Sequence, residues 1–376
     1  MKRKFLLFGA TGSIGDSTLD ILRQHPEDFE LAGFSWHNNA DKAAALQNEF
    51  KSAQSFSTNA ANAAAETERL LDLAHDFVIV AIVGAAGVHT TLAAAKRGST
   101  ILLANKESLV IAGDLVNAVV AQNNARILPV DSEHSSLYRL LSPAAGSAQP
   151  NAEWPRVRRA YLTASGGPLL HVHGEAFYNA SKALVLKHPT WVMGQKITVD
   201  SAGLTNKALE IIEAHYLFRL PYEKIQAVIH PQSYVHALLE ASDGTVTQHV
   251  SHPDMRYPIA FAMYHPEDPK VCVTDRPPAS YPAFEFMPVD EAKFRSYALG
   301  RRAGIQGKYF PAVYNAANEA AVAAFLDDNI RFGEISELIE AALAAKYDEW
   351  DITSLDGLIS YDNAARALVQ KRVMRT

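Results

Sequence analysis

The sequence predicts an α/β protein with an N-terminal Rossmann-like, doubly wound parallel sheet, an α+β domain and a C-terminal helical domain. Short apolar runs alternate with helical patterns through the first 130 residues, as in stacked βαβ units. Beyond residue 130 the apolar runs are shorter and longer loops separate them, and beyond residue 290 the chain is rich in Ala, Glu and Leu. A length of 376 residues suits two or three domains, at roughly 100 to 200 residues each.

The N-terminal sheet is predicted from five short apolar runs. These predicted strands cover residues 5–8, 29–36, 77–82, 99–104 and 126–130. Helical patterns separate them, among others at residues 16–23 and 41–50. This alternation favours parallel strands joined by crossover helices.

The later elements are predicted from shorter runs. Predicted strands cover residues 158–164, 196–199 and 224–229, and predicted helices cover 315–326 and 334–346, the latter amphipathic over 336–344. Pro282 and Pro288 mark residues 279–288 as a linker-like segment. The predicted bounds are 1–130 for the N-terminal domain, 131–265 for the α+β domain with a flexible loop at about 187–196, 266–290 for a linker and 291–376 for the helical domain.

The composition excludes several classes of protein. With 35 Lys and Arg against 41 Asp and Glu, the net charge of −6 provides no general field for nucleic acid or an anionic membrane, so an anionic ligand needs a local cluster. The single cysteine, Cys272, allows neither an internal disulfide nor a thiolate zinc site. No stretch approaches the roughly 20 apolar residues of a membrane span, and Gly9 ends the first apolar run too early for a signal peptide. We therefore expect a soluble, cytoplasmic protein.

A glycine-rich turn follows the first predicted strand and precedes a predicted helix. It reads Gly9-Ala10-Thr11-Gly12-Ser13-Ile14-Gly15. Glycines let the backbone approach a pyrophosphate, and the helix N-terminus presents free N–H groups to it. The spacing differs from the commonest dinucleotide fingerprint, so a plain tight turn is the alternative.

The second predicted strand ends without the acidic residue that a NAD site places against the ribose 2′-OH. The turn there reads His37-Asn38-Asn39. Because a carboxylate would repel a 2′-phosphate, its absence favours NADP, with His37, Asn38, Asn39 or Lys42 as partners. A solvated turn is the alternative.

Polar residues also follow the fourth and fifth predicted strands, at the edge where a parallel sheet binds its ligands. Asn105, Lys106 and Glu107 could reach a cofactor or substrate there, although a helix N-terminal turn is the alternative. Asp131-Ser132-Glu133-His134 places two carboxylates two residues apart, on one side of an extended backbone. They can converge on a hard cation, or form a solvated acidic turn.

Further motifs suggest a phosphate site with a covering loop. The segment from Thr163 to Pro168 contains a hydroxyl and two glycines after a strand, and the segment from His188 to Gly194 could be a lid or an ordered surface loop. Ser201 is predicted to be the N-cap of a helix that carries Asn206, Lys207 and Glu210, where a solvated polar face is the alternative. The histidines His230, His236 and His252 match no zinc spacing, and hard oxygen ligands elsewhere favour Mg²⁺ or Mn²⁺.

Seven of these motifs occur in one order in the 1-deoxy-D-xylulose 5-phosphate reductoisomerases of the non-mevalonate isoprenoid pathway, which the chain closely resembles. The resemblance runs from Gly9 to about Phe332 and includes the segments Ala81 to Gly87 and Asn315 to Glu319. It implies an NADPH-dependent, metal-dependent homodimer that rearranges and reduces 1-deoxy-D-xylulose 5-phosphate to 2-C-methyl-D-erythritol 4-phosphate. Both a retro-aldol/aldol route and an α-ketol shift are compatible with this resemblance.

The resemblance also implies roles for individual residues. The metal, Mg²⁺, Mn²⁺ or Co²⁺, would be held by Asp131, Glu133 and Glu210. The substrate would be held by Lys106, Ser132, Glu133, Ser165, His188, Ser201, Asn206, Lys207 and Glu210, with its phosphate at Ser165, Ser201, Asn206 and Lys207. Catalysis would rest on Lys106, Asp131, Glu133, His188 and Glu210. NADPH would contact Thr11, Gly12, Ser13, Ile14, Asn38, Asn39, Asn105, Glu107, Gly194 and Met255, and Trp191 and Met193 would belong to the closing loop.

The chain departs from the family pattern at a few positions. His37-Asn38-Asn39 replaces a common turn that contains Lys or Arg, so the usual cation near the 2′-phosphate is missing or replaced. Leu169, Gly203, Thr205 and Ala208 differ from common family residues beside the phosphate helix. These changes leave open a Rossmann dehydrogenase acting on another phosphorylated substrate, and a catalytically silent NADP-binding paralogue is the alternative outside enzymes.

Overall fold

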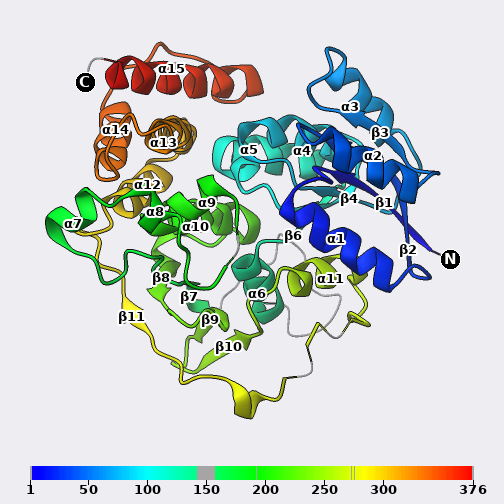
Figure 1. The fold of residues 1–376 in the computed structure, drawn as a ribbon, viewed down its shortest axis with the longest axis horizontal. Coiled ribbons are helices and arrows are strands. Elements are labelled where there is room, and N and C mark those ends of the chain that lie inside the picture. The colour runs from blue at the N-terminus through cyan, green and yellow to red at the C-terminus, as the bar shows by residue number, and fades with distance from the viewer. Residues whose placement is uncertain (1, 142–156, 192, 272, 275, 375–376) are drawn as a thin grey trace.

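The computed structural model describes residues 2–141, 157–191, 193–271, 273–274 and 276–374, so Val192 of the predicted loop and Cys272 lie outside the described residues. Figure 1 shows the N-terminal sheet on one side of the molecule, the second sheet near its centre and the C-terminal helices above that sheet. No helix within the described ranges is both long and apolar enough to cross a membrane.

The N-terminal sheet has the predicted doubly wound, parallel form. Its six strands lie in the order β3-β2-β1-β4-β5-β6, and every neighbouring pair is parallel. They are β1 (Arg3–Phe8), β2 (Phe29–Trp36), β3 (Gln54–Ser57), β4 (Phe77–Val80), β5 (Thr100–Leu103) and β6 (Arg126–Pro129). Strand β3 was not predicted, because this short edge strand is polar and Phe56 is its one buried side chain.

Helices cover both faces of this sheet. They are α1 (Ser13–Gln24), α2 (Ala40–Glu49), α3 (Ala63–Leu71), the 3₁₀ helix η1 (Gly84–Ala86), α4 (Gly87–Lys96) and α5 (Glu107–Gln122). Successive side chains of a strand point to opposite faces, so Leu6 and Phe8 join the core beneath α4 and α5, whereas Phe5 and Leu7 join the core beneath α1 and α2. Burial on both faces explains why the strands read as uninterrupted apolar runs.

The second sheet is mixed and has the order β10-β9-β7-β8-β11. Its strands are β7 (Val157–Ala164), β8 (Ile225–Ile229), β9 (Val235–Ala241), β10 (Val246–Val250) and β11 (Met287–Pro288). Only β7 and β8 are parallel. Helix α6 (Ser132–Leu141) packs against β9 and β10 and lies between the two sheets (Figure 1).

The helices around the second sheet correct two predictions. They are α7 (Gly174–Tyr178), α8 (Lys182–Val185), α9 (Gln195–Ala202), α10 (Thr205–Phe218), the 3₁₀ helix η2 (Tyr222–Lys224) and α11 (Arg256–Tyr264). The predicted strand at 196–199 is wrong, because these residues form α9, whose buried Thr198 and Val199 pack inward. Ser201 is not an N-cap either: it lies in α9, and Leu204 precedes α10 in a left-handed conformation (φ 56°).

The segment after α11 joins the second sheet to the C-terminal helices. It contains the 3₁₀ helix η3 (Pro278–Ser280) and β11, whose pairing with β8 makes this predicted linker an edge of the sheet. The C-terminal helices are α12 (Arg295–Gln306), α13 (Phe310–Leu326), α14 (Glu334–Leu343) and α15 (Leu355–Val373). Helix α15 was expected only as part of the helical region 291–376, without bounds of its own, and α13 packs against α5 and α9 as well as its neighbours.

Helix α11 returns the chain to the N-terminal core. Ile259 and Met263 are fully buried in the same cluster as Phe5 and Phe77, and the Tyr264 hydroxyl donates to Asp28 Oδ2 at 2.7 Å. This packing fixes the second sheet relative to the first, because α11 follows β10 directly in the chain.

His249 on β10 predicts a pH dependence of stability. Burial, reinforced by Arg139 and His236, lowers the pKa of His249 from 6.5 to about 4, and its Nδ1 lies 2.8 Å from Ser136 Oγ. Between these two pKa values the unfolded chain binds the proton and the folded chain does not, so stability is present above about pH 6.5 and is lost as the pH falls toward 4. Between pH 7 and pH 5 the wild type should therefore lose up to about 2 kcal/mol of unfolding free energy through His249. The His249→Gln variant should not show this part of the loss.

Urea unfolding at the two pH values measures this difference, and His249 plays no such part if the variant loses as much stability as the wild type. His89→Gln, the same change at an exposed position on α4, is the matched control.

Candidate active site

A cavity of about 640 Å³ lies at the carboxyl ends of β1, β4, β5 and β6. The loops after these strands form one wall, and α9, α10 and the loop before α9 form the other. Most of the residues predicted for the site line it: Gly12, Ser13, Ile14, Lys106, Glu107, Asp131, Ser132, Glu133, Ser165, His188, Trp191, Met193, Gly194, Ser201, Asn206, Lys207, Glu210 and Met255. Thr11, Asn38, Asn39 and Asn105 are predicted site residues that do not line it.

The glycine-rich turn has the close backbone approach that its composition predicts. Gly9 has φ 94°, and a Cβ there would lie 2.5 Å from the carbonyl oxygen of Ala81. A Cβ on Gly15 would lie 2.3 Å from the carbonyl oxygen of Ala10. Both positions therefore need glycine, and Gly12 is the N-cap of α1 and lines the cavity together with Ser13 and Ile14.

The turn after β2 is held by contacts within the protein. Asn39 Oδ1 accepts from the Lys42 backbone N–H at 3.0 Å and so caps α2, and Asn38 Oδ1 accepts from Asn59 Nδ2 at 2.8 Å. Lys42 Nζ donates to the Thr11 carbonyl oxygen at 3.0 Å and pairs with Asp16 at 2.6 Å. The Lys42 ammonium thus lies beside the glycine-rich turn, although Lys42 belongs to α2 and not to the turn after β2.

Asn105 and Glu107 brace the loop after β5. Asn105 is 1% exposed and donates to the carbonyl oxygens of Ile82 and Gly84 and to Glu107 Oε2, at 2.7, 2.9 and 3.0 Å. This leaves Asn105 as a support for the cavity wall, whereas Glu107 faces the cavity.

Three carboxylates converge in the centre of the cavity. Asp131 follows β6, Glu133 lies in the first turn of α6 and Glu210 lies on α10, and one oxygen of each lies within 4.8 Å of the others. The predicted convergence of Asp131 and Glu133 is confirmed, but their predicted extended backbone is wrong, because α6 already begins at Ser132.

Two lysines neutralise most of this negative charge. Lys106 Nζ lies 2.5 Å from Asp131 and 3.3 Å from Glu210, and Lys207 Nζ lies 2.6 Å from Glu133 and also pairs with Glu210. Burial disfavours charged Lys106, but the neighbouring carboxylates outweigh it and raise its pKa well above the usual value.

This environment shifts the pKa values of the carboxylates in different directions. Burial, and then the charge of Glu133, raises the pKa of Glu210. For Asp131, burial is outweighed by Lys106 and His134, so its pKa lies well below the usual value. Glu210 is therefore the carboxylate that gains most from an additional positive charge.

The donors suit a divalent cation such as Mg²⁺ or Mn²⁺. All three are carboxylates, the hard ligands that such ions prefer. Asp131 Oδ2 is also buried without a hydrogen bond of good geometry to any residue in the described ranges, even though Lys106 Nζ lies close to it. A metal ion at this buried oxygen would take the place of the Lys106 ammonium as its positive partner.

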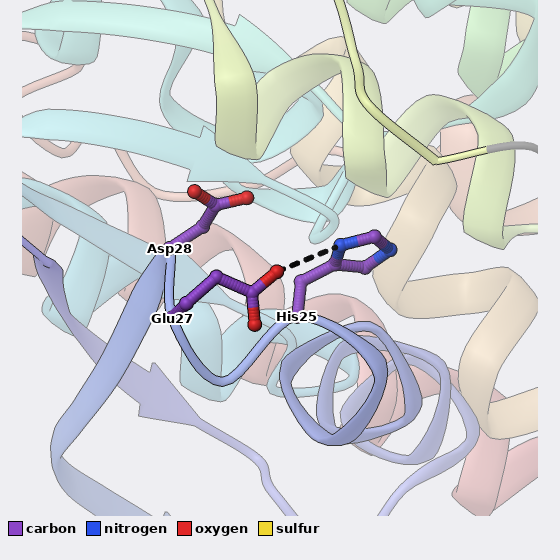
Figure 2. Close-up of side chains that lie close together, drawn as sticks. All are labelled: His25, Glu27 and Asp28. Atoms are coloured by element: carbon purple, nitrogen blue, oxygen red, sulfur yellow. Dashed lines mark ion pairs between the residues drawn. The ribbon is translucent and has the colours of Figure 1, made fainter.

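Another acidic group, in the turn after the C-terminal end of α1, has no such fit. Figure 2 shows His25, Glu27 and Asp28, where His25 Nδ1 lies 3.7 Å from Glu27 Oε1. Asp28 already accepts from Tyr264 at 2.7 Å and pairs with Lys270 at 3.1 Å. Its carboxylate is thus engaged, and we assign no metal there.

The predicted phosphate residues fall into two groups. His188 Nε2 lies 3.1 Å from both Ser165 Oγ and Ser201 Oγ, and burial lowers the pKa of His188 to about 4. By contrast, Asn206 donates to Glu210 Oε1 at 2.5 Å, and Lys207 binds the carboxylates described above. Ser165, Ser201 and His188 therefore lie together. Asn206 and Lys207 instead contact the converging carboxylates.

The predicted closing loop borders the cavity. His188 Nδ1 accepts from the backbone N–H groups of Thr190 and Trp191 at 3.2 and 2.9 Å, so the loop is tied to the serine pair. Trp191 and Met193 line the cavity with Met255, which precedes α11.

Lys196 is a residue that the sequence analysis missed as part of the site. Its Nζ lies 3.0 Å from Asp200, 3.3 Å from Glu107 and 4.0 Å from Glu319. Asn318 Nδ2 donates to Asp200 Oδ1 at 2.8 Å, so α13 of the C-terminal region also reaches this point. The spacing of Lys196 and Asp200 would have shown this pair if the segment had been read as a helix.

The departures from the family pattern are accommodated by packing. Ala208 Cβ lies 2.6 Å from the position that a Cβ on Gly300 would take, so the two small residues allow α10 and α12 to approach closely. A Cβ on Gly203 would meet Phe332 at an ordinary 3.6 Å, and Leu169 is fully buried. These residues shape the support of the site and do not alter its polar groups.

A doubly wound sheet with a glycine-rich turn and a polar cavity at its carboxyl edge is the architecture of dinucleotide-dependent enzymes. Comparison with known protein families shows to which family within this class the chain is similar. The model described as 1-deoxy-D-xylulose 5-phosphate reductoisomerase matches residues 5–113, the model of that enzyme's C-terminal domain matches 127–218, and the model described as DXP reductoisomerase C-terminal domain matches 250–368. The chain belongs to the 1-deoxy-D-xylulose 5-phosphate reductoisomerase family.

Individual relatives agree over nearly the full length. The 1-deoxy-D-xylulose 5-phosphate reductoisomerase of Leptospira biflexa is 40% identical, over 97% of this chain and 96% of that protein, and that of Pelodictyon phaeoclathratiforme is 40% identical over 98% and 99%. A crystal structure of DOX-P reductoisomerase with NADPH, fosmidomycin and magnesium has a TM-score of 0.93 and 37% identity over 99% of this chain and 98% of that one. The Zymomonas mobilis enzyme with NADPH has a TM-score of 0.87 and 32% identity, over 99% of each chain.

Removal of the Lys196 ammonium should destabilise the fold. Burial disfavours charged Lys196, but Asp200, Glu107 and Glu319 outweigh it and raise its pKa. Lys196→Met would leave these carboxylates without their shared cation, so we expect a loss of about 3 kcal/mol in the free energy of unfolding. Lys4→Met, which breaks an exposed pair with Glu30, is the matched control and should cost about 0 to 1 kcal/mol. Equal losses in a urea titration would contradict the role of Lys196.

Proposed function

We propose that this chain converts 1-deoxy-D-xylulose 5-phosphate to 2-C-methyl-D-erythritol 4-phosphate, with NADPH and a divalent cation, in the non-mevalonate isoprenoid pathway. It is an enzyme of the reductoisomerase class, which combines an isomerisation with a reduction. The observation that carries the proposal is the convergence of Asp131, Glu133 and Glu210 within 4.8 Å, beside two lysines and a dinucleotide-type turn.

In this proposal Asp131, Glu133 and Glu210 hold the cation. When bound, the cation supplies Lewis-acid polarisation of the sugar oxygens. Lys106 keeps a positive charge at the same place and binds Asn206 Oδ1 at 2.8 Å, so it can orient an oxygen of the substrate. Ser132, next to Glu133, offers a hydroxyl to the same part of the substrate.

The phosphate end of the substrate would lie at the serine pair. Ser165, Ser201 and neutral His188 offer hydroxyl and imidazole donors, and Asn206 and Lys207 can turn from the carboxylates toward the phosphate. The loop that carries Trp191 and Met193 is tied to His188, so phosphate binding at His188 can draw the loop over the cavity. Binding energy from this remote group thereby orients the reacting carbons and excludes water.

The nucleotide would lie along the glycine-rich turn. When bound, NADPH supplies the hydride for the reduction. Thr11, Gly12, Ser13 and Ile14 would face its pyrophosphate, Lys42 lies close enough to the turn to favour a 2′-phosphate, and Gly194 and Met255 would border the nicotinamide. The contacts of Asn38, Asn39 and Asn105 with NADPH stay predictions, as do the domain bounds given above. We also propose a cytoplasmic homodimer, on the strength of the family resemblance.

Turnover should require NADPH, a divalent cation and 1-deoxy-D-xylulose 5-phosphate together. Purified protein with Mg²⁺ or Mn²⁺ should oxidise NADPH, followed by absorbance, only after 1-deoxy-D-xylulose 5-phosphate is added, and NADH should be the poorer cofactor because Lys42 favours the 2′-phosphate. Other phosphorylated sugars are the control for substrate identity. Absence of turnover with the complete mixture, or faster turnover of another sugar phosphate, would contradict the proposal.

Glu210→Gln separates catalysis from cofactor binding. The amide keeps the size of the side chain but removes the negative charge that the cation needs, so activity should fall at least about 100-fold. NADPH binding, measured by fluorescence titration, should be unchanged, because Glu210 lies on α10 and the glycine-rich turn precedes α1. Retained activity would show that the metal assignment is wrong.

A further inference from the structure

A buried histidine and a fourth carboxylate lie directly behind the three converging carboxylates. Glu213, one turn after Glu210 on α10, and His134 on α6 are both 0% exposed. His134 Nδ1 lies 3.2 Å from Glu213 Oε2 and 3.7 Å from Asp131 Oδ2, and His134 Nε2 lies 2.8 Å from the Glu210 carbonyl oxygen. Neither the catalytic roles proposed above nor the cavity lining includes Glu213.

The contacts of the His134 ring fix its orientation. The Glu210 carbonyl oxygen can only accept, so Nε2 of His134 carries a hydrogen. Nδ1 then faces Glu213 Oε2 at 3.2 Å and Asp131 Oδ2 at 3.7 Å. Within the described part of the chain, neither His134 Nδ1 nor either oxygen of Glu213 has a hydrogen bond of good geometry, so His134 is the close polar neighbour of the Glu213 carboxylate. His134 is therefore the group on which Glu213 acts.

The ring of His134 joins two segments of the cation site. Through Nε2 it binds the backbone of Glu210, 76 residues further along the chain, and through Nδ1 it faces the carboxylate of Asp131. A rotation of the ring would release both contacts. His134 is thus an outer-shell partner of the carboxylates assigned to the metal, and loss of outer-shell partners typically weakens metal binding about 10- to 100-fold.

We propose that Glu213 is a positioning residue of the cation site: it fixes the ring of His134, which in turn places Asp131 and the backbone of Glu210. This inference rests on the proposed function, because it assumes a cation at Asp131, Glu133 and Glu210. Glu213 acts through His134 and touches neither substrate nor cation. A direct ligand role for Glu213 is the alternative that the experiment must separate.

The test compares Mn²⁺ binding to the full-length protein, measured by electron paramagnetic resonance of the free ion. Glu213→Leu removes the carboxylate at similar volume and should raise the dissociation constant about 10- to 100-fold. Glu213→Gln can still hydrogen bond Nδ1 and should retain most of the affinity. If Glu213→Gln weakens binding as strongly as Glu210→Gln, Glu213 is a ligand and the positioning role is wrong.

Coupling to His134 is the second measurement. In a His134→Asn background, which itself should bind Mn²⁺ about 10- to 100-fold more weakly, Glu213→Gln or Glu213→Leu should add little, because the ring that Glu213 orients is gone. Additive effects, or wild-type affinity in His134→Asn, would overturn the proposal. This arm also decides the matter if Glu213→Leu alone does not fold.

Two controls separate this proposal from the proposed function and from general damage. Glu240→Leu removes another buried carboxylate, on β9, where it pairs with Arg159, and should leave Mn²⁺ binding unchanged. NADPH affinity should stay unchanged in every variant. Loss of Mn²⁺ binding in Glu210→Gln with no effect of Glu213→Leu refutes only the positioning role, whereas wild-type binding in Glu210→Gln refutes the cation site itself.

Discussion

The structure depends on holding like charges together inside a cavity. Asp131, Glu133 and Glu210 repel one another, and their mutual repulsion grows as water is excluded. Lys106 Nζ, which lies 2.5 Å from Asp131, and Lys207 Nζ, which lies 2.6 Å from Glu133, offset this repulsion. Because Lys106 follows β5 of the first sheet and Glu210 lies on α10 beside the second, the same ion pairs that stabilise the carboxylates also fix the two sheets relative to each other.

A second charged junction extends this arrangement to the C-terminal helices. Lys196 pairs with carboxylates from α5, α9 and α13, and Arg366 on α15 pairs with Glu319 at 2.6 Å. A Cβ on Gly84 would lie 3.2 Å from Glu319 Oε1, so α13 packs directly on the loop after β4. The C-terminal helices therefore support the rear of the cavity as well as the closing loop, which ends at Lys196.

The sequence was sufficient for features that depend on local pattern, and insufficient for those that depend on distant contacts. Apolar runs identified the strands of the parallel sheet except polar β3, and chain position at strand ends identified Lys106, Asp131 and Glu133. The segment at 196–199 was misread because Ile197 and Val199 are β-branched, whereas Lys196 and Asp200 pair one helical turn apart. Contacts such as that of Lys106 with Asn206, 100 residues away, follow only from how the sheets pack. The role of Glu213 was invisible for the same reason.

Formal charge explains why a cation and an anionic substrate can share this cavity. In the cavity the three carboxylates Asp131, Glu133 and Glu210 face the two ammonium groups of Lys106 and Lys207, which leaves one net negative charge on this group. That charge opposes a sugar phosphate. With a divalent cation in place the same group carries one net positive charge, and in a cavity of low polarity this reversal acts strongly on an anion. The cation is thus needed for an attractive field at the substrate position, in addition to any part it takes in the chemistry, while the chain as a whole stays acidic at −6.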